Sequence, residues 1–346
     1  MRAHRGRVVL VIAALVLLAT LLLAAGIGAV RIPVGEGLRI LLSHLPGAHL
    51  ARTWPEPHET ILWQIRLPRV VLGALVGMAL SVAGGAYQGL FKNPLADPYV
   101  LGVSGGAAVG GALAIAFLDR MHLKTLGPVP LLAFAGGLLA VTVVYRLASV
   151  GRRVTVVALL LAGVAVGSLM ISLVSLILVI TRPLERDIII FWLMGGLSGA
   201  NWTKVGWMLP YLAAGLAALL CYGRELNALL MGEETAAHLG VDVERLKRMI
   251  LIVGSLLTAG AVAFSGAIGF VGLIVPHMVR LLVGPDHRLM LPVSALVGAT
   301  VLVAADTAAR SAFGATEVPV GLVMALAGGP FFLWLLRLKL KAAAGA

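Results

Sequence analysis

Residues 226–248 read LNALLMGEETAAHLGVDVERLKR, a charged stretch in a chain that is otherwise strongly apolar. Of the 346 residues, 60% are hydrophobic and only 12% are charged. Two apolar runs, residues 203–222 and 249–265, flank the stretch, and each is long enough to cross a bilayer as a helix. The pattern therefore predicts a polar loop between two membrane-spanning helices, and with it an all-α polytopic membrane protein.

Apolar runs of similar length recur along the rest of the chain. The clear spans are residues 8–30, 70–91, 100–118, 129–146, 154–180, 203–222, 249–265, 289–308 and 318–336. Residues 272–283 form a shorter run, which we expect to cross the membrane packed among its neighbours. Residues 188–199 are predicted to form only a partial helix outside the membrane or at its surface. The sequence thus predicts ten transmembrane helices in one domain, residues 1–346.

Basic residues indicate how the chain is oriented in the membrane. Three bases precede the first span and three follow the last: Arg2, Arg5, Arg7, Arg337, Lys339 and Lys341. Because Lys and Arg collect on the cytoplasmic side, we expect both termini to be cytoplasmic, which agrees with an even number of spans. Residues 223–248 are then a cytoplasmic loop between spans six and seven, and residues 31–66 are an extracytoplasmic loop. The net charge of +12 reflects this topology, and we expect no nucleic-acid partner.

The cytoplasmic loop carries the local signals of two short helices. Leu226, Leu229 and Leu230 have the spacing of one helix face, and Gly232 interrupts that helix. Gly240 suits the position after the end of a second helix, and Asp242 suits the cap of the helix that enters span seven. Two interpretations stay open: a solvated connector, or a docking element for a soluble partner.

Motifs for enzymatic chemistry are missing from the sequence. It contains no GxxxxGK[ST] phosphate loop, no Cys/His cluster with zinc spacing and no G-x-S-x-G elbow. Ionisable residues inside the spans, which mark ion pathways in coupled transporters, are almost absent. Asp306 is predicted to form a local ion pair with Arg310, four residues along the same helix. The chain is therefore expected to be neither an enzyme nor a self-powered transporter, although an ion-coupled secondary transporter stays as the alternative.

Residues 91–111, FKNPLADPYVLGVSGGAAVGG, combine a rigid turn with a glycine-rich helix start. Asn93-Pro94 and Asp97-Pro98 predict a tight cytoplasmic turn. The glycines that follow permit close approach of another helix. The segment is interpreted either as ordinary helix packing or as a narrow constriction that forms a gate.

At these residues the chain resembles the permease subunits of type II ABC importers for iron–siderophore complexes, haem and cobalamin. The resemblance runs from about residue 60 to 338 and rests on six motifs in the family's order. They are IRLPRVVLGALVGMALSVAGGAYQGLFKNPLADPYVLGVSGGA (65–107), LLLAGVAVG (159–167), FWLMGGLSGANW (191–202), LLMGEETAAHLGVDV (229–243), GFVGLIVPHMVRLLVGPDHRLMLP (269–292) and EVPVGLVMALAGGPFF (317–332).

The resemblance implies a multi-pass protein of the bacterial or archaeal cytoplasmic (inner) membrane, surrounded by lipid. It implies ten spans per subunit and a homodimer with the translocation path on its two-fold axis. It also implies two cytoplasmic ATPase subunits, which bind ATP and Mg²⁺, and an extracytoplasmic substrate-binding protein. No cofactor or metal is expected in this chain itself. The expected substrate is a metal chelate, with ferric siderophore as the first choice and cobalamin and haem after it.

The resemblance also assigns site residues. The charged loop matches coupling helices that insert into the ATPase, with docking residues Leu229, Gly232, Glu233, Glu234, Thr235, His238, Leu239 and Gly240. At the outer face, Arg66, Arg69 and Arg310 are expected to be presented to acidic residues of the binding protein. Asn93, Pro94, Leu95 and Thr155 match the gate regions of the translocation path.

Overall fold

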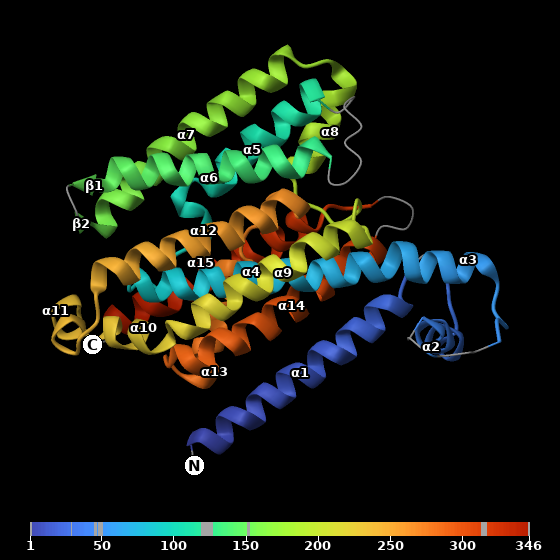
Figure 1. Cartoon of the computed structure of the whole chain (residues 1–346), viewed down its shortest axis with the longest axis horizontal. Coiled ribbons are helices and arrows are strands. Elements are labelled where there is room, and N and C mark those ends of the chain that lie inside the picture. Colours follow the sequence, from blue (N-terminus) through green and yellow to red (C-terminus); the bar gives the residue numbers. More distant parts are fainter. Residues whose placement is uncertain are drawn as a thin grey trace.

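The computed structural model describes residues 2–28, 30–44, 47, 51–118, 127–150, 153–312 and 317–344. Long helices lie side by side in an elongated bundle (Figure 1). Within the described residues, seven helical stretches are long and apolar enough to cross a membrane: Gly6–Gly26, Glu56–Leu90, Pro128–Ala148, Val156–Ile180, Trp202–Cys221, Val243–Ser265 and His287–Ala312. Three shorter apolar helices join them: Val103–Leu118, Val271–Val283 and Val320–Leu335. These helices coincide with the predicted apolar runs, so the polytopic all-α interpretation is confirmed.

The first part of the chain contains the elements up to residue 154. They are α1 (Arg2–Gly26), α2 (Val34–Ser43), α3 (Glu56–Glu59), the π-helical η1 (Thr60–Arg66), α4 (Leu67–Leu90), the 3₁₀-helical η2 (Pro98–Leu101), α5 (Val103–Leu113), the π-helical η3 (Ala114–Leu118) and α6 (Pro128–Ala148). A two-residue antiparallel pair, β1 (Ser149–Val150) and β2 (Arg153–Val154), follows α6.

The second part is helical in its described residues. It contains α7 (Val156–Ile180), α8 (Pro183–Leu193), α9 (Trp202–Cys221), α10 (Gly223–Leu230), α11 (Glu233–His238), α12 (Val243–Ser265), α13 (Val271–Val283), α14 (His287–Ala312) and α15 (Val320–Ala344). The expected partial helix at residues 188–199 is α8, which starts earlier and ends before Gly195.

The helix that contains the second predicted span begins well before the apolar run. Residues 56–90 form one continuous helical stretch through α3, η1 and α4, so helix replaces loop over residues 56–66. The segment contains the charged residues Glu56, Glu59 and Arg66. They lower its hydropathy, so the sequence predicts no membrane span there. Helix formation depends on backbone hydrogen bonds and not on apolarity, and the helix therefore continues beyond its apolar part.

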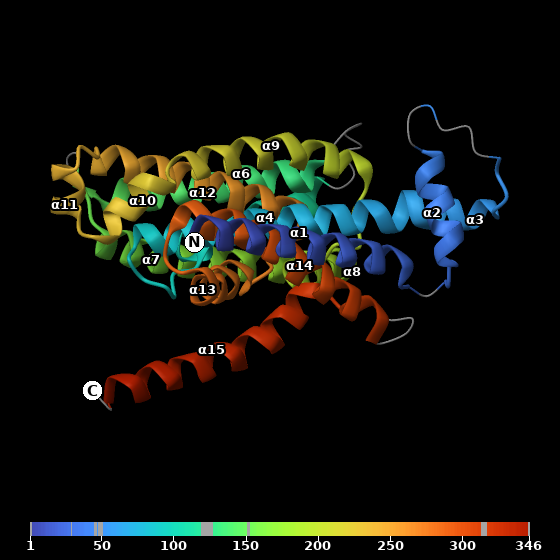
Figure 2. The ribbon, with the colours of Figure 1, turned by 90° about the horizontal axis from the view of Figure 1, so that it is seen from below.

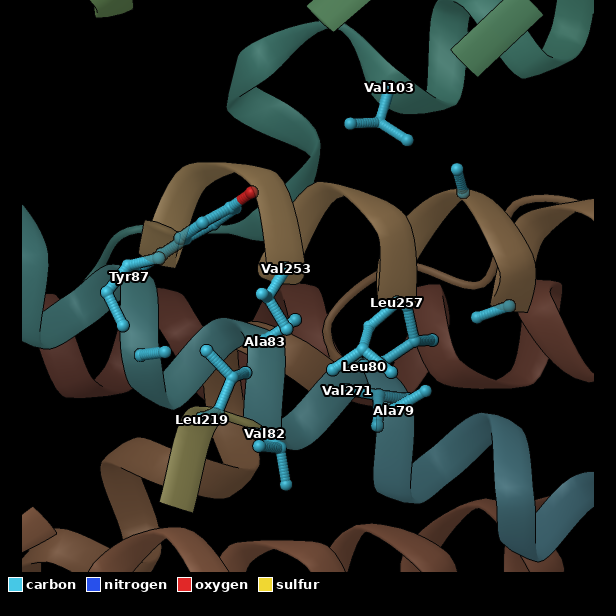
Figure 3. Packing of buried hydrophobic residues seen from close by; sticks show 14 of the residues in the cluster. Ala79, Leu80, Val82, Ala83, Tyr87, Val103, Leu219, Val253, Leu257 and Val271 are labelled. Atoms are coloured by element: carbon cyan, nitrogen blue, oxygen red, sulfur yellow. The ribbon is translucent and has the colours of Figure 1, made fainter. Parts of the chain in front are cut away.

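Helix α4 forms the centre of the bundle, and almost all of its side chains are buried. Figure 3 shows its residues Leu80, Ala83 and Tyr87 among side chains from α12. Glycines bring its neighbours close. A Cβ atom added at Gly77 would collide with the backbone of Gly298 in α14, and one at Gly84 would collide with the backbone of Gly272 in α13. Small residues thus allow the close backbone approach that transmembrane helix packing requires.

The bundle has two distinct ends. One carries α10, α11 and the first turn of α12, and is called the charged end here. The opposite end carries α2 and α3 (Figure 1) together with Arg66, Arg69 and Arg310, and is called the arginine end. Helix α1 begins and α15 ends toward the charged end, while α15 diverges from the other helices (Figure 2). Both described termini therefore point to the same side as the charged loop.

Candidate functional site

The residues at both ends of helix α11, at the charged end, explain where this helix begins and ends. Gly232 precedes the helix with φ +124°, a backbone conformation that residues other than glycine adopt only with strain. Glu233 and Glu234 occupy the first turn of the helix. At its other end Gly240 has φ +84°, its N–H donates to Ala237 O (2.9 Å), and Val241 N–H donates to Ala236 O (3.0 Å). This is a Schellman motif with glycine at the position the sequence predicted.

The next helix begins at the predicted cap. Asp242 precedes α12, and its side chain accepts a hydrogen bond from Arg245 N at 3.0 Å. The cap satisfies one of the N–H groups that a helix start leaves unpaired. The turn between α11 and α12 is therefore defined at both sides, by a C-terminal glycine motif and by an N-terminal carboxylate.

Most of the predicted docking residues are exposed on α11. Glu233, Glu234, Thr235, His238, Leu239 and Gly240 are exposed, and Gly232 is half-buried. Leu229 is fully buried and cannot be presented to a partner, so this assignment is wrong. Its spacing with Leu226 already placed it on the inner face of α10. The sequence reasoning missed Met231, which precedes α11 and is 69% exposed, while Leu239, which follows α11, is 63% exposed.

A groove adjoins α11 on the surface of the charged end. Its volume is about 590 Å³, and it lies between α10 and the α11–α12 turn. Residues of both charge signs line it, among them Arg224, Glu225, Asp242 and Arg245, with Leu239 at its edge. The charged end thus combines a protruding helix, two exposed apolar side chains and a polar groove, which are features of a docking surface.

Lys247 connects α11 to α12, and the sequence reasoning missed it. Its Nζ lies 2.7 Å from Glu233 Oε2 and 3.1 Å from Glu244 Oε1. The side chain is only 8% exposed, whereas Glu233 is 50% exposed. The available signal was the i, i+3 spacing of Glu244 and Lys247, which predicts contact on one helix face. The long-range contact with Glu233 has no such signal.

At the arginine end, the three arginines predicted to dock a partner form hydrogen bonds within this chain. Arg69 Nε and Nη2 both donate to the Asp306 carboxylate, at 3.0–3.2 Å, and Arg69 Nη1 donates to Glu317 at 2.9 Å. Arg69 is 10% exposed and Asp306 is 3% exposed. The predicted pair of Asp306 with Arg310 is present but longer, with 3.8 Å between Arg310 Nε and Asp306 Oδ2. Arg69, from another helix, is therefore the main partner of Asp306.

Arg66 and Arg310 donate hydrogen bonds to the last carbonyl groups of α1. Arg66 donates to the carbonyl oxygens of Ala25 (3.2 Å) and Gly26 (3.1 Å), and Arg310 donates to that of Ala24. A helix leaves its last carbonyls without partners and carries partial negative charge there, so cations are favourable at this position. The side chains of Arg66 and Arg310 are buried. The premise that these arginines are freely presented to a binding protein is thus wrong, while docking of a partner at this end stays a prediction.

The predicted gate residues occupy a turn and a helix cap. Asn93 Oδ1 accepts a hydrogen bond from Leu95 N at 3.0 Å, and the turn that Asn93-Pro94 predicted is present. Asp97 Oδ1 accepts one from Tyr99 N at 2.8 Å and caps η2, and burial raises the pKa of Asp97 to about 6. Thr155 caps α7, with its Oγ1 3.3 Å from Ala158 N. Their role in gating stays a prediction.

The elements that follow these two predicted gate regions, η2 and α7, pack against each other. A Cβ atom at Gly163 in α7 would collide with the carbonyl oxygen of Val100 in η2, so the glycine permits direct backbone contact. The turn at residues 91–97 therefore leads straight into an element that packs on α7.

Helix α7 has a polar stripe that the sequence reasoning missed. Ser168, Ser172 and Ser175 are exposed and recur at i, i+4 and i+7, the spacing of one helix face. Ser172 and Ser175 donate to carbonyl oxygens of their own helix. Three serines at that spacing in an apolar segment could have predicted a polar face on this helix. No group of three or more His, Cys, Asp or Glu residues in the described part of the chain is arranged to hold a metal ion.

Comparison with known proteins gives consistent relatives. A cobalamin import system permease protein of Halobacterium salinarum is 51% identical over 283 residues, which cover 82% of this chain and 75% of the relative. A hemin transport system permease protein of Yersinia pestis is 40% identical, with 82% and 86% covered. A solved structure described as a metal-chelate type ABC transporter in an inward-facing conformation superimposes with a TM-score of 0.81 at 32% identity, covering 95% of this chain and 98% of that one. The model of the FecCD transport family matches residues 15–338, nearly the whole chain. The resemblance found in the sequence is confirmed, and the chain belongs to the FecCD transport family.

Proposed function

We propose that this chain is the membrane-spanning permease subunit of an ATP-driven ABC importer for a metal chelate, working by alternating access. The observation that carries the proposal is α11, a short charged helix presented at one end of an otherwise apolar bundle. Family membership supports it, because relatives are named as permease proteins of a cobalamin import system and of a hemin transport system. The chain has no phosphate-binding loop of its own, so a separate ATPase supplies the energy.

The proposed topology has ten spans, made by the seven long helices and the three shorter apolar ones. The charged end faces the cytoplasm, with both termini on that side, and the arginine end faces outward. The basic residues near both termini support this orientation. Two ATPase subunits dock on α11 of two permease subunits, and an extracytoplasmic binding protein delivers the substrate at the arginine end. The importer lies in the cytoplasmic membrane.

The proposed homodimer places the translocation path between two copies, beside α7. In a single chain the serine stripe of α7 would face lipid, where polar groups are unfavourable. A second copy across a water-filled passage gives Ser168, Ser172 and Ser175 a polar environment. The same helix presents large apolar residues such as Leu161, which is 67% exposed, for contact with a neighbouring copy or with lipid.

Cobalamin is the substrate to test first. The permease of Halobacterium salinarum that is 51% identical to this chain is named for cobalamin import. This changes the order expected from the sequence, in which ferric siderophore came first. All three chelate classes keep the same proposed mechanism, because the binding protein selects the cargo.

Co-purification followed by reconstitution tests the proposal. The affinity-tagged chain, extracted from its native host, is expected to bring with it an ATPase whose peptides contain a phosphate-binding loop. Changing Glu233 and Glu234 together to Lys is expected to abolish this association by reversing the charge of the first turn of α11. The matched control is Glu56→Lys, an exposed acidic residue at the arginine end, which is expected to leave the ATPase bound.

The reconstituted complex, with its binding protein, is then assayed with radiolabelled cyanocobalamin and with a ferric siderophore. Uptake that requires ATP supports the proposal. Uptake by the chain alone, driven by a proton or sodium gradient, would instead establish the ion-coupled alternative.

A further inference from the structure

The contact between Lys247 and two carboxylates joins separate elements. Glu233 belongs to α11, and Glu244 belongs to the first turn of α12. An ammonium group has three donor hydrogens, so Lys247 bonds both carboxylates at once. With its side chain 8% exposed, the ammonium is shielded enough for the contacts to be stronger than those of an exposed pair.

Glu244 extends the connection to a third element. Its Oε1 accepts from Lys247, while its Oε2 accepts from the backbone N–H of Val154 at 3.3 Å. Val154 ends β2, and the next residue, Thr155, caps α7. A continuous series of polar contacts therefore leads from Glu233 in α11 to the first turn of α7.

Few other side-chain contacts hold α11. Ala236 is its buried residue, and in the part of the chain that the structure describes Glu233 is the residue of α11 whose side chain hydrogen-bonds to another element. A force on α11 consequently reaches the bundle through the backbone on both sides, by residues 231–232 toward α10 and by residues 239–242 toward α12, and through Lys247. The route through Lys247 and Glu244 is the one that leads to β2 and α7.

The far end of this route leads into a helix that packs against η2. Helix α7 contacts η2 at Gly163 and Val100, directly after the turn that contains Asn93 and Leu95. A displacement of the first turns of α7 would change the packing of both predicted gate regions together.

We infer that Lys247 is a positioning residue that transmits displacement of α11 to the β1–β2 pair and the start of α7. The inference rests on the proposed function, because it assumes that an ATPase moves α11. It assigns Lys247 and Glu244 a role in coupling rather than in docking: both lie behind α11 and not on its exposed face. The contacts of Lys247 with Glu233 and Glu244 are called the bridge below. Its role differs from simple stabilisation, since without the bridge ATP hydrolysis would continue while transport would fall.

The first test compares hydrolysis and uptake in the reconstituted complex. Lys247→Met removes the ammonium and keeps the apolar stem. We expect ATPase association and ATP hydrolysis to stay within about twofold of the unmodified complex, while ATP-dependent uptake falls about tenfold or more, a typical coupling effect. Lys247→Arg restores most of the uptake because the charge is kept. The matched control, Arg248→Met, removes an exposed charge from the same turn and leaves both activities unchanged.

Two outcomes of this assay would overturn the inference. If Lys247→Met keeps full uptake, the bridge transmits nothing. If hydrolysis and ATPase association fall together with uptake, Lys247 acts in docking or folding. A complex without ATP-dependent uptake even before mutation would instead refute the proposed function.

A second measurement reads the bridge without any transport. Hydrogen exchange of the purified full-length chain is measured over residues 149–158 and 233–240. Lys247→Met is expected to speed exchange in both segments by about tenfold, and Arg248→Met in neither. Faster exchange in residues 233–240 alone would show that the connection ends at Lys247, and the inference would be wrong. This readout decides the physical link even if the proposed function fails.

Discussion

The charged end and the arginine end contain the same type of ion contact in different surroundings. Each buries a cation that contacts two carboxylates, Lys247 at one end and Arg69 at the other, with side chains 8% and 10% exposed. One partner of each cation, Glu233 or Glu317, is 50% exposed. The difference lies in the second partner. Asp306 is 3% exposed, whereas Glu244 is 35% exposed.

This difference separates a contact that holds the fold from one that can change. A charge removed from water needs its partner, because an unpaired buried charge is strongly unfavourable. Asp306 therefore depends on Arg69, and the pair joins α4 to α14 permanently. Glu233 and Glu244 remain hydrated without Lys247, so the loss of this cation costs less than the loss of Arg69.

The residue types agree with these roles. The guanidinium of Arg69 donates from two nitrogens to one carboxylate and from a third to Glu317, which is the planar geometry that arginine provides. Lysine is a point charge on a flexible stem and imposes less geometry on its partners. A flexible link is suitable where an attached helix has to move.

The largest expected effect comes from removing the cation at the arginine end. Arg69→Met leaves Asp306 buried, with Arg310 Nε at 3.8 Å as its remaining cation. We expect a loss of about 3–5 kcal/mol in the free energy of unfolding, measured by thermal unfolding of the purified chain in detergent. Glu317→Gln, at the exposed partner, should cost less than about 1 kcal/mol. The double change Arg69→Met with Asp306→Leu should recover most of the loss, and a double variant as unstable as the single one would contradict the dependence of Asp306 on Arg69.

The same truncation at the charged end should cost less. Lys247→Met leaves two carboxylates that water still reaches, so we expect a loss of about 2 kcal/mol, between the values for exposed and buried pairs. The measurement is the same thermal unfolding, with Arg248→Met as the control, expected within about 0.5 kcal/mol of the unmodified chain. A loss as large as that of Arg69→Met would mean that the two ends do not differ.

Asp97 is a shielded carboxylate that forms no ion pair in the part of the chain that the structure describes. Burial raises its pKa to about 6, against 3.8 when exposed, so the folded chain holds this proton more tightly than the unfolded chain. The destabilisation is fully present above about pH 6 and disappears as the pH falls below about 4. Asp97→Asn keeps the cap on Tyr99 N and removes the charge. We expect it to raise stability at pH 7.5 by at most about 3 kcal/mol, since one pKa unit corresponds to about 1.4 kcal/mol, and to flatten the pH dependence between pH 4 and 6.

Thermal unfolding at pH 4.5 and pH 7.5 checks the Asp97 prediction. Asp97→Ala is the matched variant, because it removes both the charge and the cap and should gain less than Asp97→Asn. Equal pH dependence in the unmodified chain and in Asp97→Asn would show that the carboxylate is not responsible.

Features that depend on neighbours along the chain were predictable without the fold. Apolar length predicted the spans, and Gly240 and Asp242 marked the ends of α11 and α12, because helix propensity, caps and turns involve residues within a few positions. The motifs also identified the family. Leu229 shows where this reasoning was misapplied, since its helical spacing with Leu226 indicated the buried face and the residue was still assigned to docking.

The pairing of charges between helices could not be predicted from the sequence. Asp306 has Arg310 four positions away, yet its main partner is Arg69, 237 positions distant in sequence. Lys247 likewise contacts Glu233 across the turn between α11 and α12. Such pairs depend on how closely two helices approach, which in this bundle follows from contacts such as Gly77 against Gly298. Periodicity specifies the face of a helix but not the helix that will cover it, and so the sequence indicated the arginines while packing decided that they would be buried.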